Sequence, residues 1–103
     1  MQCFELEDGV LSINYEPVND IEELAEMCLR LVAESHGHEI VIVRVNQEVE
    51  ALKSCHVGVL LSCAVLASHS GKKLELECSE QFKRYLKMVD GQKLLDLTNA
   101  ELD

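Results

Sequence analysis

The sequence is poor in basic side chains. It has nine lysines and arginines against 19 aspartates and glutamates, which gives a formal net charge of −10 with the histidines neutral. Residues 1–50 contain 12 of the acids and only two bases, Arg30 and Arg44, whereas residues 51–103 contain seven of each. An acidic surface repels the phosphates of nucleic acids and of anionic lipids. We therefore expect neither a nucleic acid nor a membrane as a partner.

Long apolar runs are also missing. No stretch reaches the roughly 18 apolar residues of a membrane span, and residues 1–8 lack the basic start and apolar segment of a secretion signal. The cysteines are odd in number, without a CxxC pair: Cys3, Cys28, Cys55, Cys63 and Cys78. This pattern does not fit the disulfide scaffold of a secreted protein. We expect reduced, mostly buried thiols in a cytoplasmic protein.

Motifs for metal or nucleotide binding are not found in the sequence. The five glycines are scattered, so neither a GxGxxG loop nor a Walker loop can form. His36 with His38, and Cys55 with His56, are residue types that bind metals, but they lack the four-ligand spacing of structural zinc. We therefore expect no metal and no cofactor, and we interpret the histidines of residues 36–38 as solvated loop residues.

The chain has enough apolar residues for a core, because they make up 48% of its 103 residues, the length of a single domain. Apolar alternation on both sides of Asp8-Gly9 predicts a hairpin. Periodicity and capping residues then predict further elements in this order: a helix from residue 21 to Gly37, a strand over 40–43, a helix over 57–69, a strand over 74–78, a helix from Ser79 to Gly91, and a strand over 94–97.

This order, β-β-α-β-α-β-α-β, predicts an α/β fold over residues 1–103. We expect a small mixed β-sheet with an N-terminal hairpin and with helices packed on it. The strands over 40–43 and 74–78 should be parallel neighbours, because a helix of crossover length separates them. The continuous β-branched run Ile40–Val43 predicts a strand that is covered on both faces.

The helix predicted over residues 57–69 contains no Asp, Glu, Lys or Arg. A helix on the outside of an α/β sheet normally has a charged face. Two interpretations stay open: the helix is wedged between the sheet and its neighbours, or its apolar side binds another protein. Helical spacing puts one set on the sheet and another on the outside: Leu60, Leu61 and Ala64, and Val59, Cys63 and Leu66.

Cys55 is a candidate nucleophile. It is predicted to lie just before this helix, where the helix dipole lowers the pKa of a thiol. His56 is a poor candidate base, because residues adjacent in sequence rarely face each other within hydrogen-bond distance. We therefore predict no enzymatic activity, and a redox sensor or enzyme based on Cys55 is a minor alternative.

Several segments together resemble a known family: the central strand at 39–45, the connector at 46–53, the helix start at 53–61, the next strand at 71–74 and the closing segment at 82–95. They are similar to a STAS domain, the fold of anti-sigma factor antagonists, over nearly the whole chain. This family typically has Asp-Ser-Ser-Gly-hydrophobic-Gly at the helix start, and its second serine is phosphorylated. Ser54, Val57 and Gly58 match this motif, whereas Lys53, Cys55 and His56 replace the acid, the phosphoacceptor and the first glycine.

The resemblance implies a partner switch in bacterial regulation. An unphosphorylated antagonist binds an anti-sigma kinase through the motif and the following helix, and phosphorylation adds about two negative charges that break the contact. Here the acceptor position holds a thiol and Ser54 is one residue out of register, so we expect the usual serine phosphoswitch to be missing. The resemblance implies a partner contact in the segment 53–66, and helical spacing selects the outward residues within it. The expected contact residues are Ser54, Cys55, His56, Val59, Cys63 and Leu66.

The expected partner is another protein, in the family's usual case an anti-sigma factor or kinase. A scaffolding role as a STAS-like subunit of a larger complex is an alternative. The sequence leaves open whether the chain forms a homo-oligomer.

Overall fold

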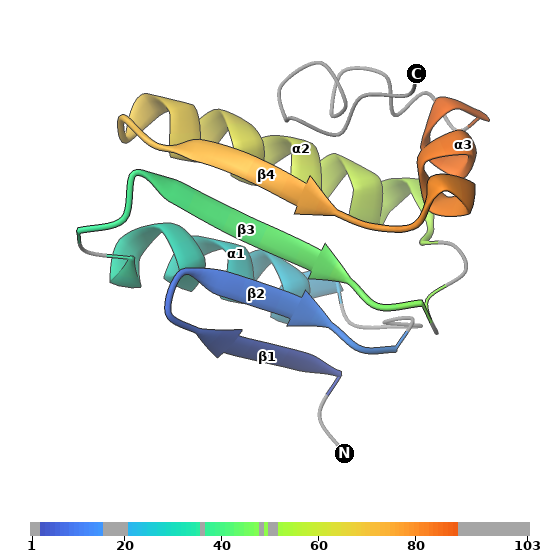
Figure 1. Ribbon diagram of the computed structural model, residues 1–103, viewed down its shortest axis with the longest axis horizontal. Coiled ribbons are helices and arrows are strands. Elements are labelled where there is room, and N and C mark those ends of the chain that lie inside the picture. Colours follow the sequence, from blue (N-terminus) through green and yellow to red (C-terminus); the bar gives the residue numbers. More distant parts are fainter. Residues whose placement is uncertain (1–2, 16–20, 36, 48, 50–51, 89–103) are drawn as a thin grey trace.

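The computed structural model describes residues 3–15, 21–35, 37–47, 49 and 52–88. Its elements are β1 (Phe4–Glu7), β2 (Val10–Ile13), α1 (Ile21–Glu34), β3 (Ile40–Val45), α2 (Ser54–His69), β4 (Lys73–Glu77) and α3 (Glu80–Met88). The four strands form one sheet in the order β1-β2-β3-β4, and α1 and α2 lie side by side across one face of it (Figure 1). The predicted α/β fold with a mixed sheet is confirmed.

The N-terminal hairpin forms as predicted. β1 and β2 pair antiparallel, with Phe4 opposite Ile13 and Glu7 opposite Val10. The turn residues Asp8 and Gly9 have φ angles of 48° and 79°. Positive φ at both central positions is the requirement of the tight turn that matches the twist of a hairpin.

The remaining strand pairs are parallel. β2 pairs with β3, and β3 pairs with β4 with Ile40 opposite Lys73 and Arg44 opposite Glu77. The two crossovers are α1, which connects β2 to β3, and α2, which connects β3 to β4 (Figure 1). The predicted parallel pairing of the strands at 40–43 and 74–78 is therefore confirmed.

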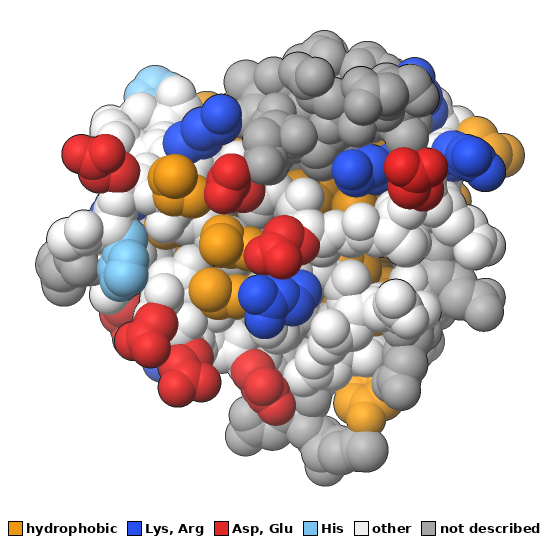
Figure 2. All heavy atoms as spheres, in the orientation of Figure 1, with side chains coloured by type: hydrophobic (Ala, Val, Ile, Leu, Met, Phe, Trp, Pro, Cys, Tyr) orange, Lys and Arg blue, Asp and Glu red, His pale blue; other side chains and the backbone are white. Residues whose placement is uncertain are grey.

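The prediction that Ile40–Val43 is covered on both faces is wrong. Val41 and Val43 are fully buried, but Ile40 on the opposite face is 47% exposed and Arg44 is exposed as well. Both crossover helices lie on the same side of the sheet, so β3 has one buried and one open face. Figure 2 shows hydrophobic and charged side chains interspersed on the open face, where Arg44 forms a 3.4 Å ion pair with Glu77.

The helix boundaries agree with the sequence at one end of α2 and differ at the other. α2 ends at His69, before the predicted Ser70-Gly71, and Gly71 has a φ of 75°. It begins at Ser54, three residues before the predicted start. Within the described residues, no helix has the length and apolar character needed to cross a membrane.

The start of α3 also agrees with the sequence. The backbone N–H of Phe82 donates a 3.1 Å hydrogen bond to Oγ of Ser79, which confirms the predicted cap. The predicted helix end at Gly91 and the predicted strand over 94–97 lie outside the described residues.

Two contacts hold the ends of α2. The ammonium group of Lys72, just after α2, donates hydrogen bonds of 2.7 and 2.8 Å to the backbone carbonyls of Ser35 and His38 at the end of α1. The hydroxyl of Tyr85 on α3 donates to the backbone carbonyl of Leu52, just before α2. The two ends of α2 are therefore tied to α1 and α3.

Candidate partner-binding surface

The inner side of α2 lies in the hydrophobic core. Leu60 and Ala64 are 1% and 3% exposed, as the helical spacing predicts, while Leu61 is only partly buried. Val57 and Ala67 are also buried on this helix. Burial of this side accounts for how α2 is held on the sheet, because each fully buried leucine contributes about 1.5–3 kcal/mol.

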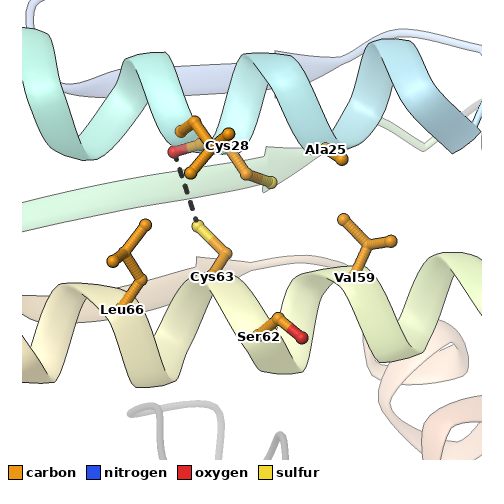
Figure 3. Close-up of a pocket in the computed structure, with 7 residues that line it drawn as sticks. Ala25, Cys28, Val59, Ser62, Cys63 and Leu66 are labelled. Atoms are coloured by element: carbon orange, nitrogen blue, oxygen red, sulfur yellow. Dashed lines mark hydrogen bonds between the residues drawn. The ribbon is translucent and has the colours of Figure 1, made fainter.

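A second side of α2 packs against α1, which corrects the predicted outward set. Cys63 is 2% exposed, and Val59 and Leu66 are half-buried. Figure 3 shows these three side chains pointing from α2 toward α1. The prediction that they face outward is therefore wrong, because α1 covers the stripe that they form.

The third side of α2 faces solvent. We define the outer stripe of α2 as its exposed residues at helical spacing: Ser54, Gly58, Ser62, Val65 and His69. Val65 is 41% exposed and is the most apolar member. The outer stripe lies about one residue, or about 100° of rotation, from the predicted stripe. It contains no Asp, Glu, Lys or Arg, so α2 is neither buried all round nor covered by a charged face.

The first turn of α2 separates the motif positions into two groups. Lys53, Ser54, Cys55 and Gly58 are exposed, whereas His56 is 2% exposed and belongs to the core. Cys55 lies within the first helical turn instead of before the helix. The Sγ atom of Cys55 lies 3.8 Å from Nδ1 of His56, which is a long contact. The Cys55 side chain is exposed to solvent, whereas the His56 ring is buried.

The neighbouring helix α1 has charged side chains on its exposed side. The exposed residues of α1 include Glu22, Glu26 and Arg30, and Arg30 forms a 2.7 Å ion pair with Glu34. Leu29 of α1 is 58% exposed and extends the uncharged surface from α2 onto α1. A surface with a charge-depleted centre and a charged rim is the usual composition of a protein interface.

Between α1 and α2 lies an apolar groove of about 250 Å³. It is lined by Ala25, Cys28, Leu29, Val59, Ser62, Cys63 and Leu66 (Figure 3). Ser62 belongs to both the outer stripe and this lining, so the groove opens beside the outer stripe.

The thiols differ in their surroundings. Cys28 and Cys63 are buried, Cys3 and Cys78 are partly buried, and Cys55 is exposed. The expectation that most thiols are buried therefore holds for Cys28 and Cys63 and holds in part for Cys3 and Cys78. It does not hold for Cys55. Burial raises the pKa of Cys78 to about 11. The interaction with the Cys63 side chain, together with burial, raises the pKa of Cys28, and the same interaction lowers that of Cys63.

The residue types that can bind metals do not converge in the described part of the chain. No three His, Cys, Asp or Glu side chains there come close enough to hold a metal ion. His38 is exposed, and its predicted companion His36 lies outside the described residues.

The chain was compared with known proteins at three levels. No family model matches it, and no curated protein matches it. Among solved structures, the NMR structure of the protein TM1081 is similar, with a TM-score of 0.63 over 91% of this chain and 77% of that chain. The two sequences are 20% identical, so this similarity shows the fold alone.

Proposed function

We propose that this chain is a protein-binding regulatory module of the STAS type, which acts by binding another protein through α2. The observation that carries the proposal is the outer stripe of α2. From Ser54 to His69 the helix has no Asp, Glu, Lys or Arg, although one of its sides is exposed to solvent. A solvent-facing helix gains solubility from charge, so its lack of charge fits a surface that is covered by a partner.

The position of the outer stripe supports the same proposal. The family resemblance puts partner contacts at the start of this helix, and in this chain Ser54, Cys55 and Gly58 are exposed there. Of the residues predicted to bind the partner, we keep Ser54 and Cys55, and we assign Val59 and Leu66 to the edge of the surface. We replace the buried His56 and Cys63 with Ser62 and Val65.

The proposed mechanism of control differs from that of the family. The position of the phosphoacceptor is occupied by Cys55, which is exposed in the first turn of α2. A thiol is not the hydroxyl that a serine kinase modifies, so the added charge that would break the contact is missing. We propose that binding is constitutive or is controlled by other means, in the cytoplasm of a bacterium, with an anti-sigma factor or kinase as the partner.

A pair of matched substitutions tests the proposal. Val65→Glu puts a charge on the outer stripe, and Ile40→Glu makes a similar change on the open face of the sheet. The two residues are 41% and 47% exposed, so both variants should fold, which circular dichroism and urea unfolding can check. The immobilised wild-type chain is used to capture its partner from cells of the source organism, and the purified partner is then titrated with each variant.

We expect Val65→Glu to weaken binding of the purified partner at least tenfold and Ile40→Glu to leave it unchanged. Loss of binding in Ile40→Glu alone would move the interface to the open face of the sheet. Equal binding by both variants would refute the role of α2.

A further inference from the structure

Cys28 and Cys63 meet across the interface between α1 and α2. They are 3% and 2% exposed. Sγ of Cys63 lies 3.9 Å from the backbone carbonyl oxygen of Cys28, and the two side chains are close enough to shift each other's pKa. Figure 3 shows both side chains in the space between the helices. Two cysteines that lie this close on separate helices can do chemistry that neither can do alone.

The groove gives small molecules access to this pair. Both cysteines line it, together with Ala25, Val59 and Leu66. Its volume of about 250 Å³ is several times the ~30 Å³ that one water molecule occupies. The groove lies directly beside both thiols, whose sulfur atoms must approach to about 2.05 Å to form a disulfide.

The surroundings favour a bond between the sulfurs over a metal site. Structural zinc usually takes four protein ligands. Across the described ranges, no third His, Cys, Asp or Glu side chain joins Cys28 and Cys63 to complete such a set. A two-electron oxidation of the pair needs no further side chain.

We propose that Cys28 and Cys63 form a reversible disulfide that links α1 to α2 when a small-molecule disulfide enters the groove. The Cys63 thiolate attacks one sulfur of the small disulfide, whose S–S bond breaks and releases one thiolate. Cys28 then loses its proton and attacks Sγ of Cys63, and the mixed disulfide breaks to release the second thiolate. The two cysteines lose two electrons and two protons, and the small disulfide becomes two thiols.

The electrostatics agree with this order of attack. The interaction with the Cys28 side chain lowers the pKa of Cys63, whereas Cys28 itself has a raised pKa because of this interaction and of its burial. The lowered pKa of Cys63 agrees with its role as the thiol that attacks the small disulfide. Cys28 resolves the mixed disulfide from the facing helix. The proposal stands independently of the partner-binding function, because it concerns only the contact between α1 and α2.

The test measures thiols in the purified, fully reduced chain after incubation with oxidised glutathione. Among the five cysteines of the denatured protein, we expect Cys28 and Cys63 to lose their titratable thiols, in addition to any mixed disulfide at the exposed Cys55. Peptide mapping by mass spectrometry without reduction should find one peptide pair, linked through Cys28 and Cys63. Dithiothreitol should restore all the thiols. Oxidation should also raise the midpoint of urea unfolding, because a cross-link between distant residues restricts the unfolded chain.

Three variants serve as controls. Cys55→Ser removes the exposed thiol and should still form the cross-link, while Cys28→Ala and Cys63→Ala should each lose it. The proposal is overturned if Cys28 and Cys63 of the wild-type chain both remain alkylatable after denaturation, or if oxidation yields only glutathione adducts or dimers through Cys55. Because this readout uses the wild-type chain, it holds even if an alanine variant fails to fold.

Discussion

α1 and α2 lie side by side on one face of the same sheet, yet their outer surfaces differ. The inner side of α1 contains Leu24 and Leu31 and that of α2 contains Leu60, all of them buried. α1 exposes glutamates and Arg30, whereas α2 exposes glycine, serine and valine. The fold requires only that the inner sides be apolar. The outer side is free to be charged, so the uncharged surface of α2 calls for a cause other than folding.

The largest effects should come from the inner sides, where the two helices are alike. We expect Leu24→Ala and Leu60→Ala each to lower the free energy of unfolding by about 2–5 kcal/mol, because each leaves a cavity in the core. Urea unfolding monitored by circular dichroism measures both changes. A loss below about 1 kcal/mol for Leu60→Ala alone would mean that α2 is not packed in the core as α1 is.

A smaller loss of stability should follow when the hydrogen bonds between the end of α2 and the end of α1 are removed. Lys72 donates to the carbonyls of Ser35 and His38 after α1, so Lys72→Met should cost about 1–3 kcal/mol by leaving these acceptors without that donor. The neighbouring Lys73 is exposed, and Lys73→Met is the matched control, with an expected change within about 0.5 kcal/mol. Similar values for the two variants would show that the contacts of Lys72 contribute nothing.

Giving α2 an outer surface like that of α1 should change binding more than stability. We expect Ser62→Glu to raise the Kd for the captured partner about tenfold, or roughly 1.4 kcal/mol, and to change the unfolding free energy by less than about 0.5 kcal/mol. Glu26→Gln on the exposed side of α1 should leave the Kd nearly unchanged. Calorimetric titration measures both variants, and a larger effect of Glu26→Gln would place the contact on α1.

The last effect appears only at high pH and concerns the thiol that α1 contributes to the interface. Cys28 has a raised pKa, and that of Cys78 is raised from 9.0 to about 11. The unfolded chain therefore releases these protons at a lower pH than the folded chain does. The unfolding free energy should fall as the pH rises from about 9 toward 11.

Alanine variants identify the groups responsible for this pH dependence. We expect Cys28→Ala and Cys78→Ala each to make the decline shallower than in the wild-type chain. Urea unfolding at several pH values under reducing conditions measures the slopes. An unchanged slope in both variants would assign the decline to other groups.

The sequence predicted the elements that are marked by a turn motif, a capping residue or a charged helix face. Asp8-Gly9 identified the hairpin and Ser79 identified the start of α3, because each has a local physical requirement. The glutamates of α1 showed which of its sides faces solvent. α2 has no such charges, so the predicted outward set was wrong by one residue. Its small residues Gly58 and Ser62 were the signal that could have corrected it.

Other features depend on how elements pack in three dimensions. The start of α2 was placed too late because Lys53, which precedes it, makes no capping hydrogen bond with its side chain. A β-branched run such as Ile40–Val43 looks the same whether one or both faces are covered. The meeting of Cys28 and Cys63 depends on how α1 and α2 pack together, which no local pattern encodes.

The ties at the two ends of α2 have a consequence for the entropy of binding. Lys72 and Tyr85 hold the helix to its neighbours before any partner arrives. The exposed glycine, serine and valine of the outer stripe also have few rotamers to lose, whereas ordering a lysine or glutamate costs up to about 2 kcal/mol. A partner that docks on α2 therefore meets a surface whose conformational freedom was already removed by folding, so most of the ordering during association falls on the partner.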